Sequence, residues 1–337
     1  GHFRFQCHGE RVFHLEIALG FQHRGVEESL LGGPHRHTAA RMETLAGDTT
    51  VGHATAFSQA LEALSGTSVP PRAQAVRGIA LELERLANHA GDLGALAGDV
   101  GFLPTASYCG RLRGDFLNMT ALLCGSRFGR GLVRPGGVLF DVDDAMADEL
   151  RRRLDETMKD LRGAVELLFG AATVTARFEG TGRVDPATAE SIGLVGPAAR
   201  ACGVDQDVRR DHPTGIWRFA HVPVMTAHDG DVNSRAFVRW LEAQRSADFV
   251  KAQLASLPKG GVRNAPKELR PEHVAVSLVE GWRGEVCHVA VTGEDARLRR
   301  YKVVDPSFHN WMGLAMALRN EEISDFPLCN KSFNLSY

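Results

Sequence analysis

The chain has 337 residues, of which 44% are hydrophobic and 24% are charged, and its formal net charge is −2. This is the composition of a soluble globular protein of one large or two ordinary domains, and its charge balance gives no reason to expect nucleic acid as a partner. None of its hydrophobic runs reaches the roughly 18 residues of a membrane span, and its six cysteines form no C-x-x-C pair, so we expect a reducing compartment.

The first predicted element is a β-hairpin. Residues 3–19 alternate between hydrophobic and polar side chains, with a turn at His8-Gly9-Glu10. The opening residues GHFRF already belong to this alternation, so we expect further residues upstream of Gly1.

A helical pattern follows from about residue 38 to residue 258, which predicts an antiparallel helix bundle. Each helix repeats hydrophobic residues at helical spacing, and most of them close near a glycine. The clearest predicted helix, at residues 141–170, begins with several aspartates and carries charge pairs four residues apart. The predicted helices cover residues 51–66, 73–98, 110–129, 141–170 and 234–258.

Strand-like runs return after a polar linker, at residues 273–281, 285–293 and 299–305. We expect these C-terminal strands to pair with the N-terminal hairpin in one small sheet against the bundle. The predicted fold class is α+β, mainly α. A single domain would comprise an N-terminal β region (1–37), the helical bundle (38–258) and a C-terminal β/α region (273–337).

The segment VDPSFHNW (304–311) holds the residue types of an acyl-transfer triad, namely Asp305, Ser307 and His309. A triad needs these groups aimed at one another, usually from separate segments. Because the three are sequence neighbours, we favour a strand that ends at Val304 and a helix capped by Asp305 or Ser307.

Two further polar clusters allow more than one interpretation. Glu82, Arg85 and His89 share one face of a predicted helix, and the spacing is compatible with a buried network or an exposed ion-pair face. His35 and His37 form a His-x-His pair in a Gly/Pro-rich loop, which favours solvated side chains over a metal site.

Several motifs resemble, in chain order, the large subunit of membrane-associated nickel–iron hydrogenases of group 4 and the 49-kDa subunit of respiratory complex I. The resemblance covers nearly the whole chain, and the segment at 193–213 is its most specific part. The matching segments are HRGVEESL (23–30), HATAFSQALEAL (53–64), ALELERLANHAGDLGAL (80–96), VRPGGV (133–138), GLVGPAARACGVDQDVRRDHP (193–213), RGEV (283–286) and residues 305–310.

The resemblance identifies four positions where the hydrogenases bind nickel and iron through cysteines. These positions hold Ala46, Thr49, Ser307 and Asn310. Soft thiolates suit these metals, whereas methyl, hydroxyl and amide groups do not replace them. We therefore predict that this chain binds no nickel–iron centre and no other metal, and that Asp305-Pro306 is the remaining frame of the motif.

The complex I branch carries Ser and Asn at the C-terminal pair, as this chain does. In that branch, quinone is thought to approach a tyrosine and a histidine. The tyrosine position falls here on Gly47 or nearby, and no tyrosine precedes Tyr108. His2 is a candidate for the histidine.

The resemblance implies roles for several other residues. Glu27 matches a glutamate that relays protons, Arg283 matches an arginine over the cavity, and Asp48 adds a carboxylate beside the former metal positions. Trp282 replaces a proline before that arginine and would partly fill the cavity. A supporting polar network is expected from Arg24, His53, Glu82, Arg85, His89, Asp211 and His212.

The resemblance implies a peripheral subunit on the cytoplasmic face of the inner membrane. Its expected partners are a small subunit with an iron–sulfur cluster and membrane subunits that resemble ion pumps. Quinone or another electron acceptor would bind in the former metal cavity, with Glu27 and Asp48 moving protons, as in an NADH:quinone oxidoreductase. The alternative is a scaffold subunit with a collapsed site, and an active hydrogenase ranks third.

Overall fold

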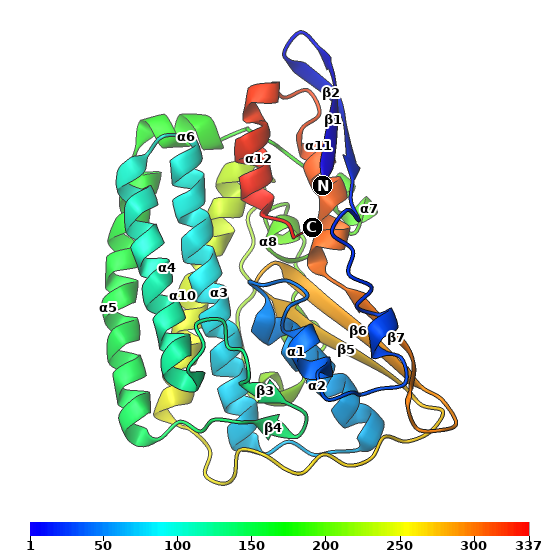
Figure 1. Cartoon of the computed structure of the whole chain (residues 1–337). Coiled ribbons are helices and arrows are strands. Elements are labelled where there is room, and N and C mark those ends of the chain that lie inside the picture. Colours follow the sequence, from blue (N-terminus) through cyan, green and yellow to red (C-terminus); the bar gives the residue numbers. More distant parts are fainter. Residues whose placement is uncertain (337) are drawn as a thin grey trace.

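The computed structural model describes residues 1–336 and has a four-helix bundle on one side (Figure 1). The long helices alternate in direction, as predicted, and leucine, alanine and phenylalanine side chains fill the space between them. Asp143 caps the third helix of the bundle, α5 (Asp144–Phe169), by accepting a hydrogen bond from the amide of Met146. The bundle consists of α3 (Pro71–Asp99), α4 (Leu103–Cys124), α5 (Asp144–Phe169) and α10 (Val232–Ala255).

A three-stranded antiparallel sheet lies beside the bundle. It contains β5 (Val274–Gly281), β6 (Gly284–Thr292) and β7 (Leu298–Val304), in that order, which confirms the three predicted strands. Helix α2 (Thr50–Ser65) packs across β5 and β6 rather than joining the bundle, which corrects our expectation for residues 51–66. Phe57, Leu61 and Leu64 of α2 are buried against Ala275, Ala290 and Tyr301 of the sheet.

The N-terminal hairpin is confirmed, with β1 (His2–His8) paired to β2 (Arg11–Ala18). The expectation that both chain ends form one sheet is wrong, because β1 and β2 make a separate two-stranded sheet. The hairpin buries its apolar face against helices instead, through Phe3 against Trp311 and Phe326. The aromatic side chains of the hairpin are thus buried against helices, and the hairpin does not pair with β5–β7.

The transition from β7 to α11 (Pro306–Ala317) has the predicted form. The strand ends at Val304, and Asp305 caps the helix by accepting a hydrogen bond from the Ser307 amide at 2.9 Å. The hydroxyl of Ser307 accepts a hydrogen bond from the amide of Ser336, so it is not aimed at a histidine as a triad would require.

The remaining elements are short, and five of them lie between α5 and α10. Among residues 1–336, no helix is long and apolar enough to cross a membrane. These elements are η1 (Glu28–Leu30), α1 (Thr38–Met42), β3 (Val133–Arg134), β4 (Gly137–Val138), α6 (Ala172–Phe178), α7 (Pro186–Ser191), α8 (Gly196–Arg200), α9 (Val208–Asp211), η2 (Gly215–Arg218), η3 (Ile323–Asp325) and α12 (Phe326–Phe333).

Candidate functional site

A cavity of about 720 Å³, the main cavity, lies where the loop before α2, the end of β7 and the start of α11 meet. Its wall combines apolar side chains with a few polar groups, which is the usual make-up of a small-molecule site. The predicted site residues Arg24, Glu27, Ala46, His53 and Ser307 all line it, together with Asp305.

Of the four positions that the resemblance assigns to metal ligands, Ala46 and Ser307 line this cavity, and the four residues together offer no metal-binding set. Ala46 has no donor atom, and the amide of Asn310 is hydrogen-bonded to the backbone of Val195 at 3.0 and 3.1 Å. The Thr49 hydroxyl is fully buried and accepts a hydrogen bond from Arg283. A nickel–iron centre requires thiolates, so these residues do not fit one.

Glu27, predicted to relay protons, lies on the cavity wall and is partly exposed. One oxygen of its carboxylate accepts a hydrogen bond from the amide of Val303 at 3.0 Å, and Lys302 pairs with it at 3.0 Å. Arg24 donates to the carbonyl of Thr44 at 2.7 Å and thereby braces the loop that carries Ala46. Glu27 is therefore held in place by β7 and stays open to solvent.

Asp48 and Arg283 bind each other instead of facing the main cavity. The guanidinium makes two parallel hydrogen bonds to the carboxylate, at 2.6 and 2.7 Å. Trp282 is fully buried beneath this pair, and its indole donates to the carbonyl of Asp48 at 2.8 Å. This part of the former site is packed, as the presence of Trp282 suggests.

Glu82, Arg85 and His89 belong to a fully buried ionic cluster, which decides between the two interpretations of their helical spacing. Arg85 pairs with Glu82 at 3.1 Å, and His89 bonds to Glu242 at 2.9 Å. Sequence reasoning missed the other members because they come from distant segments. They are Arg200, Asp207, Arg209, Glu242 and Glu280.

The cluster stabilises its carboxylates through guanidinium groups rather than through water. Burial opposes charge on Glu242, but Arg200 and the hydrogen bond from His89 hold its pKa well below the ordinary value. Burial, with the nearby charge of Asp207, raises the pKa of Glu280. The carboxylates of the cluster outnumber its guanidinium groups by one. Glu280, whose pKa is raised, is the carboxylate that most readily takes up a proton.

Asp211 and His212 lie outside that cluster, at the surface. Both are exposed and line a separate acidic pocket of about 430 Å³, in which Arg210 pairs with Asp211 at 2.7 Å. The same RRDHP segment contributes Arg209 to the cluster, two or three positions earlier than the expected Asp211 and His212.

His53 begins a chain of hydrogen bonds that leads from the main cavity into the sheet. Its Nε2 lies 3.1 Å from Asp305 Oδ2, and its Nδ1 lies 3.0 Å from Nε2 of His288. The Nδ1 of His288 lies 2.8 Å from the hydroxyl of Tyr301. The signal for His288 was a lone histidine on the inward-facing register of β6, between Val286 and Ala290.

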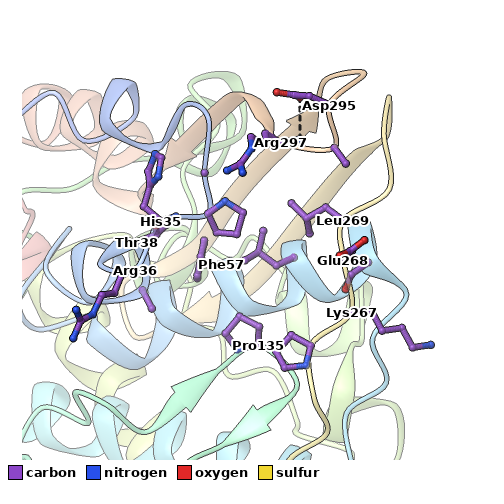
Figure 2. Close-up of a pocket in the computed structure, with 17 residues that line it drawn as sticks. His35, Arg36, Thr38, Phe57, Pro135, Lys267, Glu268, Leu269, Asp295 and Arg297 are labelled. Atoms are coloured by element: carbon purple, nitrogen blue, oxygen red, sulfur yellow. Dashed lines mark hydrogen bonds between the residues drawn. The ribbon is translucent and has the colours of Figure 1, made fainter.

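A second cavity of about 550 Å³ opens further along α2, beside Phe57, Leu61 and Ser65 (Figure 2). Its floor is apolar, with Phe57 and Leu269, and none of the predicted catalytic or network residues lines it. Asp295 accepts a hydrogen bond from the amide of Arg297, and Arg297 donates to the carbonyl of Gly32. These polar groups hold their own loops together, so we assign the chemistry to the main cavity.

A helix bundle joined to a small sheet is the arrangement that the resemblance to hydrogenase-related large subunits implies. The model of the respiratory-chain NADH dehydrogenase 49 Kd subunit matches residues 99–276, more than half of the chain. The chain therefore belongs to the family of this 49 Kd subunit, to which certain hydrogenase subunits are also similar.

Three curated relatives illustrate the range of this family. The carbon monoxide-induced hydrogenase of Rhodospirillum rubrum is 30% identical over 99% of this chain and 92% of its own length. NADH-quinone oxidoreductase subunit 4 of Thermus thermophilus is 29% identical over 94% of this chain and 84% of its own length. Formate hydrogenlyase subunit 5 of Escherichia coli is 30% identical over the whole chain, which spans 59% of that relative.

Proposed function

We propose that this chain is the acceptor-binding subunit of a membrane-associated electron-transfer complex and that it works without a nickel–iron centre. Quinone or another small electron acceptor would bind in the main cavity, and electrons would come from an iron–sulfur cluster in a small partner subunit. The main support for this proposal is the cavity of about 720 Å³, which is lined by Ala46 and Ser307 at two positions that the resemblance assigns to metal ligands. A scaffold with a collapsed site would have filled that space.

The proposed assembly follows from the kinds of protein that are similar to the chain. Relatives are named as subunits of NADH-quinone oxidoreductase and of formate hydrogenlyase. We therefore place this chain at the cytoplasmic face of the inner membrane, as a peripheral subunit beside the small iron–sulfur subunit and ion-pump-like membrane subunits. Glu27 lines the main cavity, whereas Arg283 holds Asp48 away from it, which favours Glu27 over Asp48 as the proton-moving carboxylate.

Filling the main cavity tests this function. A Cβ atom at Gly47 would meet nothing within 4 Å, and Gly47 lines the cavity. We expect Gly47→Trp to lower the rate of electron transfer from the reduced complex to a water-soluble quinone by at least about tenfold, because the indole occupies the acceptor's space. Gly261→Trp is the control, since Gly261 also has open space around it but lies in an exposed loop. Equal rates in both variants would contradict the proposal.

Glu27→Gln tests the proton relay separately. The amide oxygen of glutamine can still accept the hydrogen bond from Val303, so the loop should keep its position while the titrating group is lost. We expect the proton-coupled reduction of the acceptor to slow by roughly 10²-fold, the size of a general acid–base contribution. The control is Glu28→Gln, an exposed neighbour. Unchanged proton and electron transfer in the Glu27 variant would remove Glu27 from the mechanism.

A further inference from the structure

When Asp305 is ionised and both imidazoles are neutral, the hydrogen-bond chain from Asp305 to Tyr301 has only one arrangement of protons that satisfies every contact. A carboxylate can only accept, so the hydrogen on His53 must be on Nε2, which leaves its Nδ1 as an acceptor. His288 must then donate from Nε2, and its Nδ1 must accept from the hydroxyl of Tyr301. Every donor in the chain therefore points toward Asp305.

The electrostatic surroundings keep His288 and Tyr301 uncharged and favour an ionised Asp305. Burial and the adjacent His53 lower the pKa of His288 well below its ordinary value, so its imidazole stays uncharged. Burial raises the pKa of Tyr301, so its hydroxyl keeps its proton. Burial opposes the charge on Asp305, but the hydrogen bond from His53, the charge of His53 when it is protonated, and the charge of Arg283 hold the pKa of Asp305 below its ordinary value.

Asp305 is also the N-cap of α11, where the helix dipole and the Ser307 amide favour a negative charge. Its side chain is 22% exposed and lines the main cavity. A carboxylate offers about four acceptor positions, and the two hydrogen bonds from His53 and Ser307 leave further capacity toward the cavity. The cavity wall therefore presents a fixed hydrogen-bond acceptor.

We propose that Asp305 makes the main cavity selective for the reduced, hydroxyl-bearing form of its acceptor, and that His53, His288 and Tyr301 are positioning residues that hold Asp305 ionised and aimed. The proposal rests on the proposed function, since it concerns the ligand of the same cavity. A hydroquinone O–H donates to the carboxylate, whereas the carbonyl oxygen of the oxidised ring is repelled by it. Hydrogen bonds to charged groups make this difference worth roughly 10- to 100-fold in affinity.

The replacement Asp305→Asn separates charge from structure, because asparagine is as good an N-cap as aspartate. Its Oδ1 can keep the Ser307 amide while its Nδ2 donates to Nε2 of His53. His53 must then carry its hydrogen on Nδ1, and the direction of the chain reverses as far as Tyr301. The variant thus replaces a fixed acceptor with a donor, at unchanged side-chain size.

The test combines binding to the purified complex with imidazole ¹⁵N spectroscopy of the labelled chain. A water-soluble benzoquinone and its hydroquinone are equilibrated anaerobically with the complex, and both bound forms are quantified. We expect the wild type to prefer the hydroquinone, and the preference to fall by roughly 10- to 100-fold in Asp305→Asn. Asp295→Asn is the control, because that carboxylate lines the second cavity.

Tyr301→Phe tests the positioning role through a spectroscopic signature. In the wild type we expect the Nε2–H tautomer at both His53 and His288. Removing only the hydroxyl should leave His288 in mixed tautomers and reduce the hydroquinone preference less than Asp305→Asn does. Tyr108→Phe, at a half-exposed position away from the chain, should change neither quantity.

The possible outcomes distinguish a failure of the selectivity proposed for Asp305 from a failure of the proposed acceptor binding in the main cavity. If both forms bind with an affinity ratio that Asp305→Asn leaves unchanged, the selectivity proposal fails and the proposed function stands. If the complex binds neither form, both fail. A wild-type His53 that carries its hydrogen on Nδ1 would overturn the proposed direction of the chain.

Discussion

Replacing Arg200 with methionine is expected to lower the free energy of unfolding by about 3–5 kcal/mol, the cost of leaving a buried charge unpaired. Arg200 is 1% exposed and lies at the centre of the buried ionic cluster. It donates to Glu242 at 2.8 Å and to Glu280 at 2.9 Å. Methionine fills a similar volume, so the loss measures the charge and its hydrogen bonds rather than a cavity.

Arg111→Met is the matched control for that measurement. Arg111 also pairs with two carboxylates, Asp115 at 2.9 Å and Asp160 at 2.7 Å, but half of its side chain is exposed. Solvent screens such pairs, so we expect a loss of less than about 1 kcal/mol. Urea unfolding of both variants gives the comparison. Similar losses of unfolding free energy in the two variants would show that burial does not make the ion pairs of the cluster more stabilising than exposed pairs.

Gly196→Ala is expected to destabilise the fold by about 2–5 kcal/mol, because it combines backbone strain with a direct clash. Gly196 has a φ of +66°, and a Cβ there would lie 2.1 Å from the carbonyl oxygen of Arg283. The clash would push the turn that carries Arg283 away from α8, and with it the pair that Arg283 forms with Asp48.

Gly193→Ala provides the control for this second prediction. Gly193 has nearly the same φ, +68°, but a Cβ there would meet nothing within 4 Å. Only the left-handed backbone cost of roughly 1–2 kcal/mol should remain. Denaturant unfolding of the two variants isolates the clash, and equal losses would mean that the contact between Gly196 and the Arg283 turn is unimportant.

Local patterns were sufficient for most of the fold. The helices of the bundle, the hairpin and the three C-terminal strands follow from periodicity and from Gly, Pro and Asp at their ends. The two errors concern how elements meet. Nothing in residues 51–66 distinguishes a helix in a bundle from one that covers a sheet, because both bury a broad apolar face. The hairpin found its apolar partner in Trp311 and Phe326, which no local signal relates to β1.

In the candidate site too, the sequence indicated which residues belong to it but not how side chains from distant segments meet. The resemblance to known motifs led to Glu27, Ala46, His53 and Ser307, and these four residues lie together in the main cavity. The pairing of Asp48 with Arg283 depends on a side-chain partner that comes from a distant segment. Long-range ionic clusters of this kind leave no periodic trace in the sequence.

The central claim is that the main cavity holds an organic electron acceptor where related hydrogenases bind metal. The most direct measurement is photolabelling of the purified complex with an azido-quinone, followed by mass spectrometry of the labelled peptides. We predict label on residues 19–27, 43–53 and 302–311, three segments that line the cavity, and its loss in the presence of excess unlabelled quinone. Label confined to other subunits, together with stoichiometric nickel on this chain, would contradict the account.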